Sequence, residues 1–197
     1  MSAAGENASY PLCFRDTEGR FILRYKYEGI TLHSDGMEWT AETRAAQRYA
    51  DIDAISLTTG YIARSGAIAS CSIRFRDFSY LSVTSTNRFG TPDDGRNETY
   101  GAFIRDLHGR LSEADRRRIN FHAGSTAGKQ SFGQAVFVIA AAFFIALPLV
   151  LFFITGEWKA LGLMFAGGVL VVPLWRTLRK NEPRMYDPLH LDDDVFP

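Results

Sequence analysis

The residues best able to do chemistry are scattered along the chain. Its histidines show no HxxxH or HExxH spacing and form no cluster with the cysteines. They are His33, His108, His122 and His190, and the cysteines are Cys13 and Cys71. Metal sites need several such ligands at characteristic spacings. The pattern therefore predicts no metal site, and we expect no bound cofactor.

Two pairs of polar residues come closest to a catalytic or ligand-binding pattern. Asp106 and His108 are two residues apart on a predicted helix, so they point to different faces and do not form a dyad. Asp93 and Asp94 lack the alternating oxygen ligands of a calcium loop and are typical of a solvated turn. Because the chain also lacks a nucleophile elbow and a phosphate loop, we expect it not to be an enzyme.

The charge balance argues against binding to nucleic acid. The chain has 22 Lys and Arg residues against 22 Asp and Glu residues, whereas nucleic-acid binders normally carry a basic surplus. The two cysteines show no CxxC spacing, and we interpret them as reduced thiols in a cytosolic core. A single disulfide between them is the alternative.

The polar first two-thirds of the chain has the pattern of short β-strands. Apolar and polar residues alternate over several stretches separated by turn signals such as Ser34–Gly36. The stretches are Phe21–Tyr27, Ile30–His33, Met37–Thr40, Ile55–Thr58, Cys71–Arg76 and Leu81–Thr84. Strands at this spacing predict a sandwich or barrel.

The pattern changes to that of a helix near Tyr100. Apolar residues recur at i, i+3, i+4, i+7 and i+11 from Tyr100 to Leu111, which predicts an amphipathic helix with one buried face. Ser112, followed three residues later by Asp115, predicts the capped start of a second short helix over Glu113–Phe121.

Two apolar runs dominate the last third. Ala135–Thr155 is uncharged and, at about 1.5 Å per residue, reaches roughly the 30 Å of a bilayer core. Ala160–Trp175 is also uncharged but shorter, so a strongly tilted span and a re-entrant segment both stay open. Together they predict a transmembrane helical hairpin. The alternative, a buried hairpin of a soluble protein, would need a larger covering layer than the polar part offers.

Positive charges flank the two runs and are nearly absent from the turn between them. The positive-inside rule then places both termini in the cytoplasm. Aromatic and basic residues at the ends of the second run are predicted to anchor it at the membrane interface. These anchors are Trp158, Trp175, Arg176, Arg179 and Lys180.

Several strands followed by one amphipathic helix, Tyr100–Leu111, resemble the pleckstrin-homology-like (PH-like) fold, in which such a helix closes a bent sandwich. Over roughly residues 10–175 the chain resembles bacterial membrane proteins that join a PH-like domain to a pair of transmembrane helices. The resemblance implies an α+β fold and a bacterial inner (cytoplasmic) membrane location with two passes, and it carries over no functional residues. In many of those relatives the domain follows the hairpin, whereas here it precedes it.

The expected organisation has seven parts. They are a disordered N-terminus (1–9), a cytoplasmic PH-like domain (10–122), a linker (123–131), transmembrane helix 1 (132–155), a non-cytoplasmic turn (156–159), transmembrane helix 2 (160–176) and a cytoplasmic tail (177–197).

Two groups of residues are candidate interaction sites. Arginines near one end of the predicted sandwich could contact phosphorylated headgroups or an acidic partner, or could be ordinary solvated residues. They are Arg64, Arg74, Arg76 and Arg88. The tail is either disordered or docked as an extended segment onto the domain or a partner. Its candidate docking residues are Met185, Tyr186, Leu189, Leu191, Val195 and Phe196.

An anchor without charges, a domain without catalytic residues and a partly apolar tail predict a non-enzymatic scaffold or accessory subunit of an inner-membrane assembly. The expected partners are the lipid bilayer and either a membrane protein or a second copy of the chain. The alternative function is an anionic-lipid or ligand sensor at the cytoplasmic membrane face.

Overall fold

The computed structural model shows an α+β chain that divides into two compact units. Unit 1 contains Met1–Gly124 and Arg184–Pro197, and unit 2 contains Ser125–Pro183. The described residues are 7–16, 27–62, 66–124, 127–156, 158–180, 182–191, 193 and 196–197. Arg184–Pro197 therefore belong to the same unit as the first 124 residues.

Unit 1 is built on a nine-stranded mixed sheet in the order β4-β3-β2-β1-β7-β6-β5-β8-β9. Neighbouring strands are antiparallel except β5 and β8, which are parallel. The strands are β1 (Ala8–Arg15), β2 (Tyr27–Leu32), β3 (Gly36–Thr40), β4 (Arg44–Arg48), β5 (Ile52–Ile62), β6 (Gly66–Phe75), β7 (Tyr80–Thr84), β8 (Asn120–Ala123) and β9 (Arg184–Met185), and a short 3-10 turn (Tyr49–Asp51) precedes β5.

Period-two alternation determines which side chains form the core. In β6, Cys71, Ile73 and Phe75 are buried, whereas Ser72 and Arg74 point to the opposite face. Most of the strand predicted at Phe21–Tyr27 lies outside the described residues. Strand β1 already begins at Ala8, inside the segment predicted as a disordered N-terminus.

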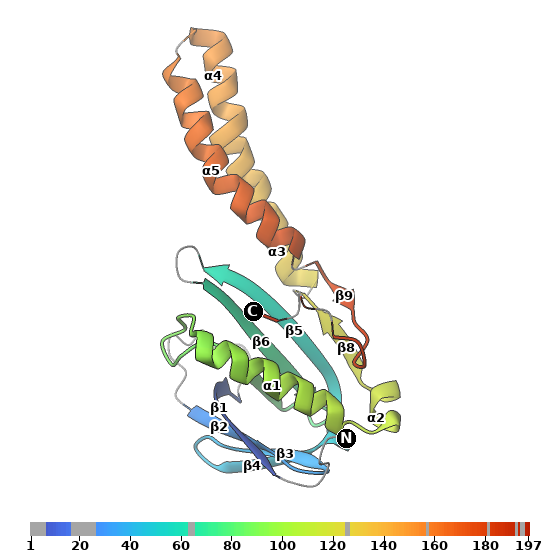
Figure 1. Cartoon of the computed structure of the whole chain (residues 1–197). Coiled ribbons are helices and arrows are strands. Elements are labelled where there is room, and N and C mark those ends of the chain that lie inside the picture. Colours follow the sequence, from blue (N-terminus) through green and yellow to red (C-terminus); the bar gives the residue numbers. More distant parts are fainter. Residues whose placement is uncertain are drawn as a thin grey trace. The chain divides into compact units, whose positions relative to one another are not determined.

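Helix α1 (Asp94–Arg110) lies across one face of this sheet (Figure 1). Its apolar face is fully buried, and each such side chain contributes about 1.5–3 kcal/mol through its removal from water. The buried residues include Tyr100, Phe103, Ile104 and Leu107. The helix begins six residues before Tyr100 because Asp93 caps it, accepting a hydrogen bond from the Arg96 amide at 3.2 Å.

Helix α2 is shorter than the sequence predicts. The predicted cap is present, since the Asp115 amide donates to the Ser112 hydroxyl at 3.1 Å. The helix spans Glu113–Arg118 and does not continue to Phe121. Residues 120–123 instead form β8, whose pairing with β5 satisfies backbone groups at the sheet edge and buries the Phe121 ring.

Unit 2 consists of two long helices side by side (Figure 1). The first is continuous through α3 (Ala127–Ala141), a π-helical stretch (Ala142–Ala146) and α4 (Leu147–Thr155). The second is α5 (Lys159–Lys180). Close packing depends on glycine at Gly167, because a Cβ there would lie 2.5 Å from the Cβ and 2.7 Å from the carbonyl oxygen of Phe144.

Among the described residues, one helix is long and apolar enough to cross a membrane. It runs from Gln130 to Thr155, 26 residues, and only 6 % of its most apolar window is buried within the protein. Within the described part of the chain, the second expected span is not found as another such helix. The charges of Lys159 and Arg176 restrict the uncharged part of α5 to fewer than the roughly 20 residues that a bilayer core requires.

Candidate functional site

The end of the chain is an extra edge strand of the sheet. Strand β9 pairs antiparallel with β8, with Met185 opposite His122 and Arg184 opposite Ala123. Strand β8 in turn pairs with β5. The two segments on either side of unit 2 thus meet in one ladder within unit 1.

Tyr186, directly after β9, is the anchor of this contact. Its ring is buried, and its hydroxyl lies 2.8 Å from Nε2 of His108 on α1. Nδ1 of His108 lies 2.7 Å from the Ile104 carbonyl oxygen, which can only accept. The proton of a neutral ring therefore resides on Nδ1, and Nε2 accepts the hydrogen bond that the Tyr186 hydroxyl donates. The rings of His108, Phe121 and Tyr186 lie in mutual contact, with centroids 5.5–5.8 Å apart.

Burial sets the protonation state of this pair. Burial of the imidazole, together with the nearby charge of Arg116, lowers the pKa of His108 to about 4 despite the hydrogen bond to Ile104. Burial also raises the pKa of Tyr186 well above its usual value. Both groups are therefore neutral at pH 7, as their hydrogen bond requires.

The remaining tail residues divide into inward-facing and exposed side chains. Leu191 and Phe196 pack partly buried against the core, and the Phe196 ring centroid lies 4.6 Å from the Arg105 guanidinium carbon. Met185 and Leu189 are largely exposed. Val195 lies outside the described residues.

A cavity of about 360 Å³ remains between α1 and the tail. Its lining includes basic side chains from helices α1 and α2 and apolar and acidic side chains from the tail. They are Arg105, His108, Gly109, Arg116, Pro188, Leu189, Leu191, Asp193 and Phe196. Arg116 also caps the C-terminal end of α1, since its guanidinium donates a hydrogen bond to the His108 carbonyl oxygen at 3.0 Å.

The predicted arginine cluster does not assemble among the described residues. Arg74 faces outward from the end of β6 and pairs with Asp53 at 2.6 Å, and Arg76 follows it in the β6–β7 turn. Arg88 comes after β7, which runs back along β6, so it lies near the opposite end of β6. Arg64 lies outside the described residues.

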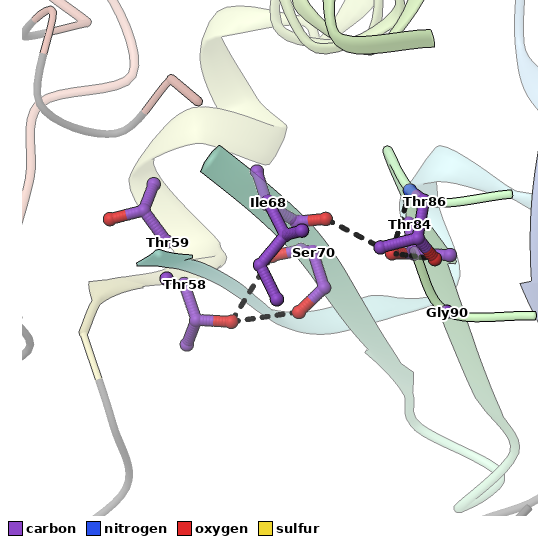
Figure 2. A pocket seen from close by; sticks show the side chains of 9 residues that line it. Thr58, Thr59, Ile68, Ser70, Thr84, Thr86 and Gly90 are labelled. Carbon is purple, nitrogen blue, oxygen red and sulfur yellow. Dashed lines mark hydrogen bonds between the residues drawn. The ribbon is translucent and has the colours of Figure 1, made fainter. Parts of the chain in front are cut away.

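A pocket of about 230 Å³, whose lining includes Gly90 two residues after Arg88, combines five side chains that carry hydroxyl groups with apolar surface (Figure 2). The Thr58 and Ser70 hydroxyl oxygens are 2.7 Å apart, and those of Thr84 and Thr86 are 3.2 Å apart. The full lining is Thr58, Thr59, Gly60, Ile68, Ala69, Ser70, Thr84, Thr86 and Gly90. Such a pocket can hydrogen-bond a small polar ligand, and none of these lining residues is charged.

The loop beside this pocket displays a cation and an aromatic ring. The Asn87 side chain holds the loop, accepting from the amides of Phe89 at 2.9 Å and Thr91 at 3.2 Å. Arg88 and Phe89 are exposed, and the Arg88 guanidinium carbon is 5.7 Å from the Phe89 ring centroid.

A second exposed ring lies at the β6–β7 turn. Phe78 is 88 % exposed and has a positive φ of 65°, a conformation that is strained for an aromatic residue. The carboxylate of Asp77 fixes the turn by accepting from the Ser79 amide at 2.9 Å and from the Ser79 hydroxyl at 2.6 Å.

The remaining predicted residues have structural surroundings. Asp106 accepts from Tyr10 and Arg110, both at 2.9 Å, so it faces away from His108 as its spacing predicts. Both cysteines are buried free thiols. Among the described residues, no group of three His, Cys, Asp or Glu side chains could hold a metal ion.

The predicted interface residues lie on α5 and just before it. Trp158 contacts Phe152 with ring centroids 5.5 Å apart, and Trp175 contacts Phe137 at 5.2 Å. Arg179 is exposed, and the side chains of Arg176 and Lys180 lie outside the described part.

Two of these features had a usable sequence signal that our prediction did not include. His108 falls at i+8 from Tyr100 and i+4 from Ile104, on the buried face of the helix, which identifies it as a core histidine. The hydroxyl pocket could have been predicted from Thr58, Ser70 and Thr84, which lie at the polar positions of alternating strands and are paired across β5, β6 and β7.

No protein-family model matches this chain, and no curated protein or solved structure is significantly similar to it.

Proposed function

We propose that the protein is a non-enzymatic, membrane-anchored interaction protein of the bacterial inner membrane, with a PH-like domain on the cytoplasmic side. The observation that carries this proposal is the β8–β9 ladder. It joins the segments before and after unit 2 within unit 1. A chain that leaves a folded unit and returns to it can cross a bilayer only an even number of times.

The return of the chain to unit 1 supports a two-pass hairpin although α5 alone is marginal as a span. The first helix has the length and composition to cross, so the second must return the chain to the side of unit 1. Arg176, Arg179 and Lys180 at the end of α5 favour the cytoplasm as that side.

The strand order supports a PH-like domain. Strands β1–β4 and β5–β7 form two antiparallel meanders that β1 and β7 connect, and α1 covers the core that they share. Strands β8 and β9 are additions to this plan, and they connect it to unit 2.

Thiol labelling of intact cells tests the anchor and its orientation. A membrane-impermeant reagent should label a Trp158→Cys chain before lysis and a Leu189→Cys chain only after lysis, since both positions are exposed in the protein. The native thiols provide a low background because both are buried. Labelling of Leu189→Cys in intact cells would contradict the proposal.

Extraction in mild detergent followed by mass spectrometry tests the interaction role. We expect either a defined partner or a second copy of the chain at stoichiometric amounts. Elution as a lone monomer under every extraction condition would count against a scaffold or accessory subunit.

The hydroxyl pocket favours a second candidate function, sensing of a phosphorylated polar ligand or headgroup. Arg88, two residues before Gly90 of the lining, is exposed and supplies a positive charge in the adjoining loop. Gly124, where the chain leaves unit 1, donates its amide to the carbonyl of Leu57, next to Thr58. Titration of the detergent-solubilised chain with glycerol 3-phosphate should show binding that Arg88→Ala weakens. Arg74→Ala, at the other end of β6, is the matched control and should bind like the wild type.

A further inference from the structure

The surface beneath the tail has the features of a peptide-binding site. It consists of the part of α1 that carries Gly101, Arg105 and His108 and is covered by the tail, together with Phe121 and the edge of β8; we call it the tail-binding surface. Strand addition at the edge supplies backbone hydrogen bonds, and the space between His108 and Phe121 receives a tyrosine ring. Gly101 leaves room for Phe196, whose Cδ1 would lie 3.8 Å from a Cβ built there.

The tail occupies this surface through few contacts. Strand β9 has two residues, both exposed, and Tyr186 is the buried anchor. An open cavity of about 360 Å³ lies beside the tail, between it and α1. Contacts of this size can open locally without unfolding the rest of the unit.

The charges identify the kind of segment that fits. Arg105 and Arg116 on the domain line the same cavity as Asp193 of the tail. A segment that carries a buried tyrosine, an aspartate and a phenylalanine at the spacing of Tyr186, Asp193 and Phe196 is complementary to this surface, and every copy of the chain carries one.

We propose that the tail-binding surface also accepts the tail of a second copy of the chain, so that two anchored copies are joined by exchanged tails. The exchanged contacts would be the same as those within one chain, so exchange adds only the cost of association. Confinement of the copies to one membrane lowers that cost. This inference rests on the proposed interaction function and names its partner.

Two complementary full-length variants test the exchange. Tyr186→Ala with Phe196→Ala removes the tail anchors and leaves the surface intact. Gly101→Leu occupies the place of the Phe196 ring and leaves the tail intact. With different affinity tags in detergent, the two variants should copurify with each other at least 5-fold more than either does with itself.

A synthetic peptide of residues 183–197 should compete with this association. The same peptide with Tyr186→Phe should compete about 5-fold less well, because it lacks only the hydroxyl that donates a hydrogen bond to His108. Arg76→Ala, distant from the tail, is the control for tagging and folding, and circular dichroism verifies that each variant is folded. Mixed variants that associate no better than each variant alone would overturn the exchange. A different protein that copurified with the wild type would then leave the proposed function intact.

Discussion

At the scale of single residues, His108 links the fold to pH. Its pKa is about 4 in the folded protein, below the ordinary 6.5, so the unfolded state takes up a proton first as the pH falls. The stability of unit 1 should be constant above about pH 6.5. It should decrease between pH 6.5 and 4 by about 3 kcal/mol in total.

Denaturant unfolding at pH 8 and pH 5, followed by near-ultraviolet circular dichroism, measures this effect. His108→Gln should remove most of the pH dependence, whereas His190→Gln, at an exposed position, should leave it unchanged. If the free energy of unfolding changed equally with pH in both variants, the pH dependence would come from groups other than His108.

Phe78 is a residue whose backbone conformation is costly. Its φ of 65° is unfavourable for an aromatic side chain and favourable for glycine. Because the ring is exposed, Phe78→Gly should stabilise the protein by about 1 kcal/mol through relief of this strain. Thermal unfolding measures the change, with Phe89→Gly as the control on another exposed loop ring. A destabilised Phe78→Gly chain would show that the ring has a packing role.

At the scale of elements, two adjacent glycines of α5 predict opposite outcomes. A Cβ at Gly167 would lie 2.7 Å from the Phe144 carbonyl oxygen, whereas a Cβ at Gly168 would have no described atom within 4 Å. Gly167→Ala should therefore force the two helices apart and lower the melting temperature in detergent. Gly168→Ala should match or slightly exceed the wild type, because alanine favours helix. Equal melting temperatures would contradict the packing of α5 against Phe144.

At the scale of the whole molecule, unit 2 is an insertion in unit 1. Ala123 and Arg184 are ladder partners, so a short turn can join them. A chain in which residues 125–182 are replaced by a two- to four-residue glycine-rich turn should fold as a soluble domain.

Soluble expression and a cooperative thermal transition are the measurements for this excised chain. Tyr186→Ala in the same chain should lower the midpoint, since it removes the buried anchor on His108. If the excised chain aggregated while the wild-type chain, prepared in parallel, was folded, unit 2 would be needed for unit 1 to fold.

Local sequence patterns predicted many of the strands and helices of this fold. They did not predict the contacts between segments that are distant in the sequence. Alternation identified β6 and β7, and helical periodicity identified the buried face of α1. Phe121 was assigned to a helix because its local sequence continues the helical pattern, while the open edge of β5, distant in sequence, determines its strand conformation. The separation of Arg74 from Arg88 likewise depends on the direction of β7, which composition does not encode.

The ladder between β8 and β9 also imposes an order of events during synthesis. The first 124 residues leave the ribosome before the apolar helices, and Tyr186 leaves after them. His108 can gain its partner only once both helices have been made and the chain has turned back. Completion of the domain thus requires that the chain has passed through unit 2 and returned to the β8 edge.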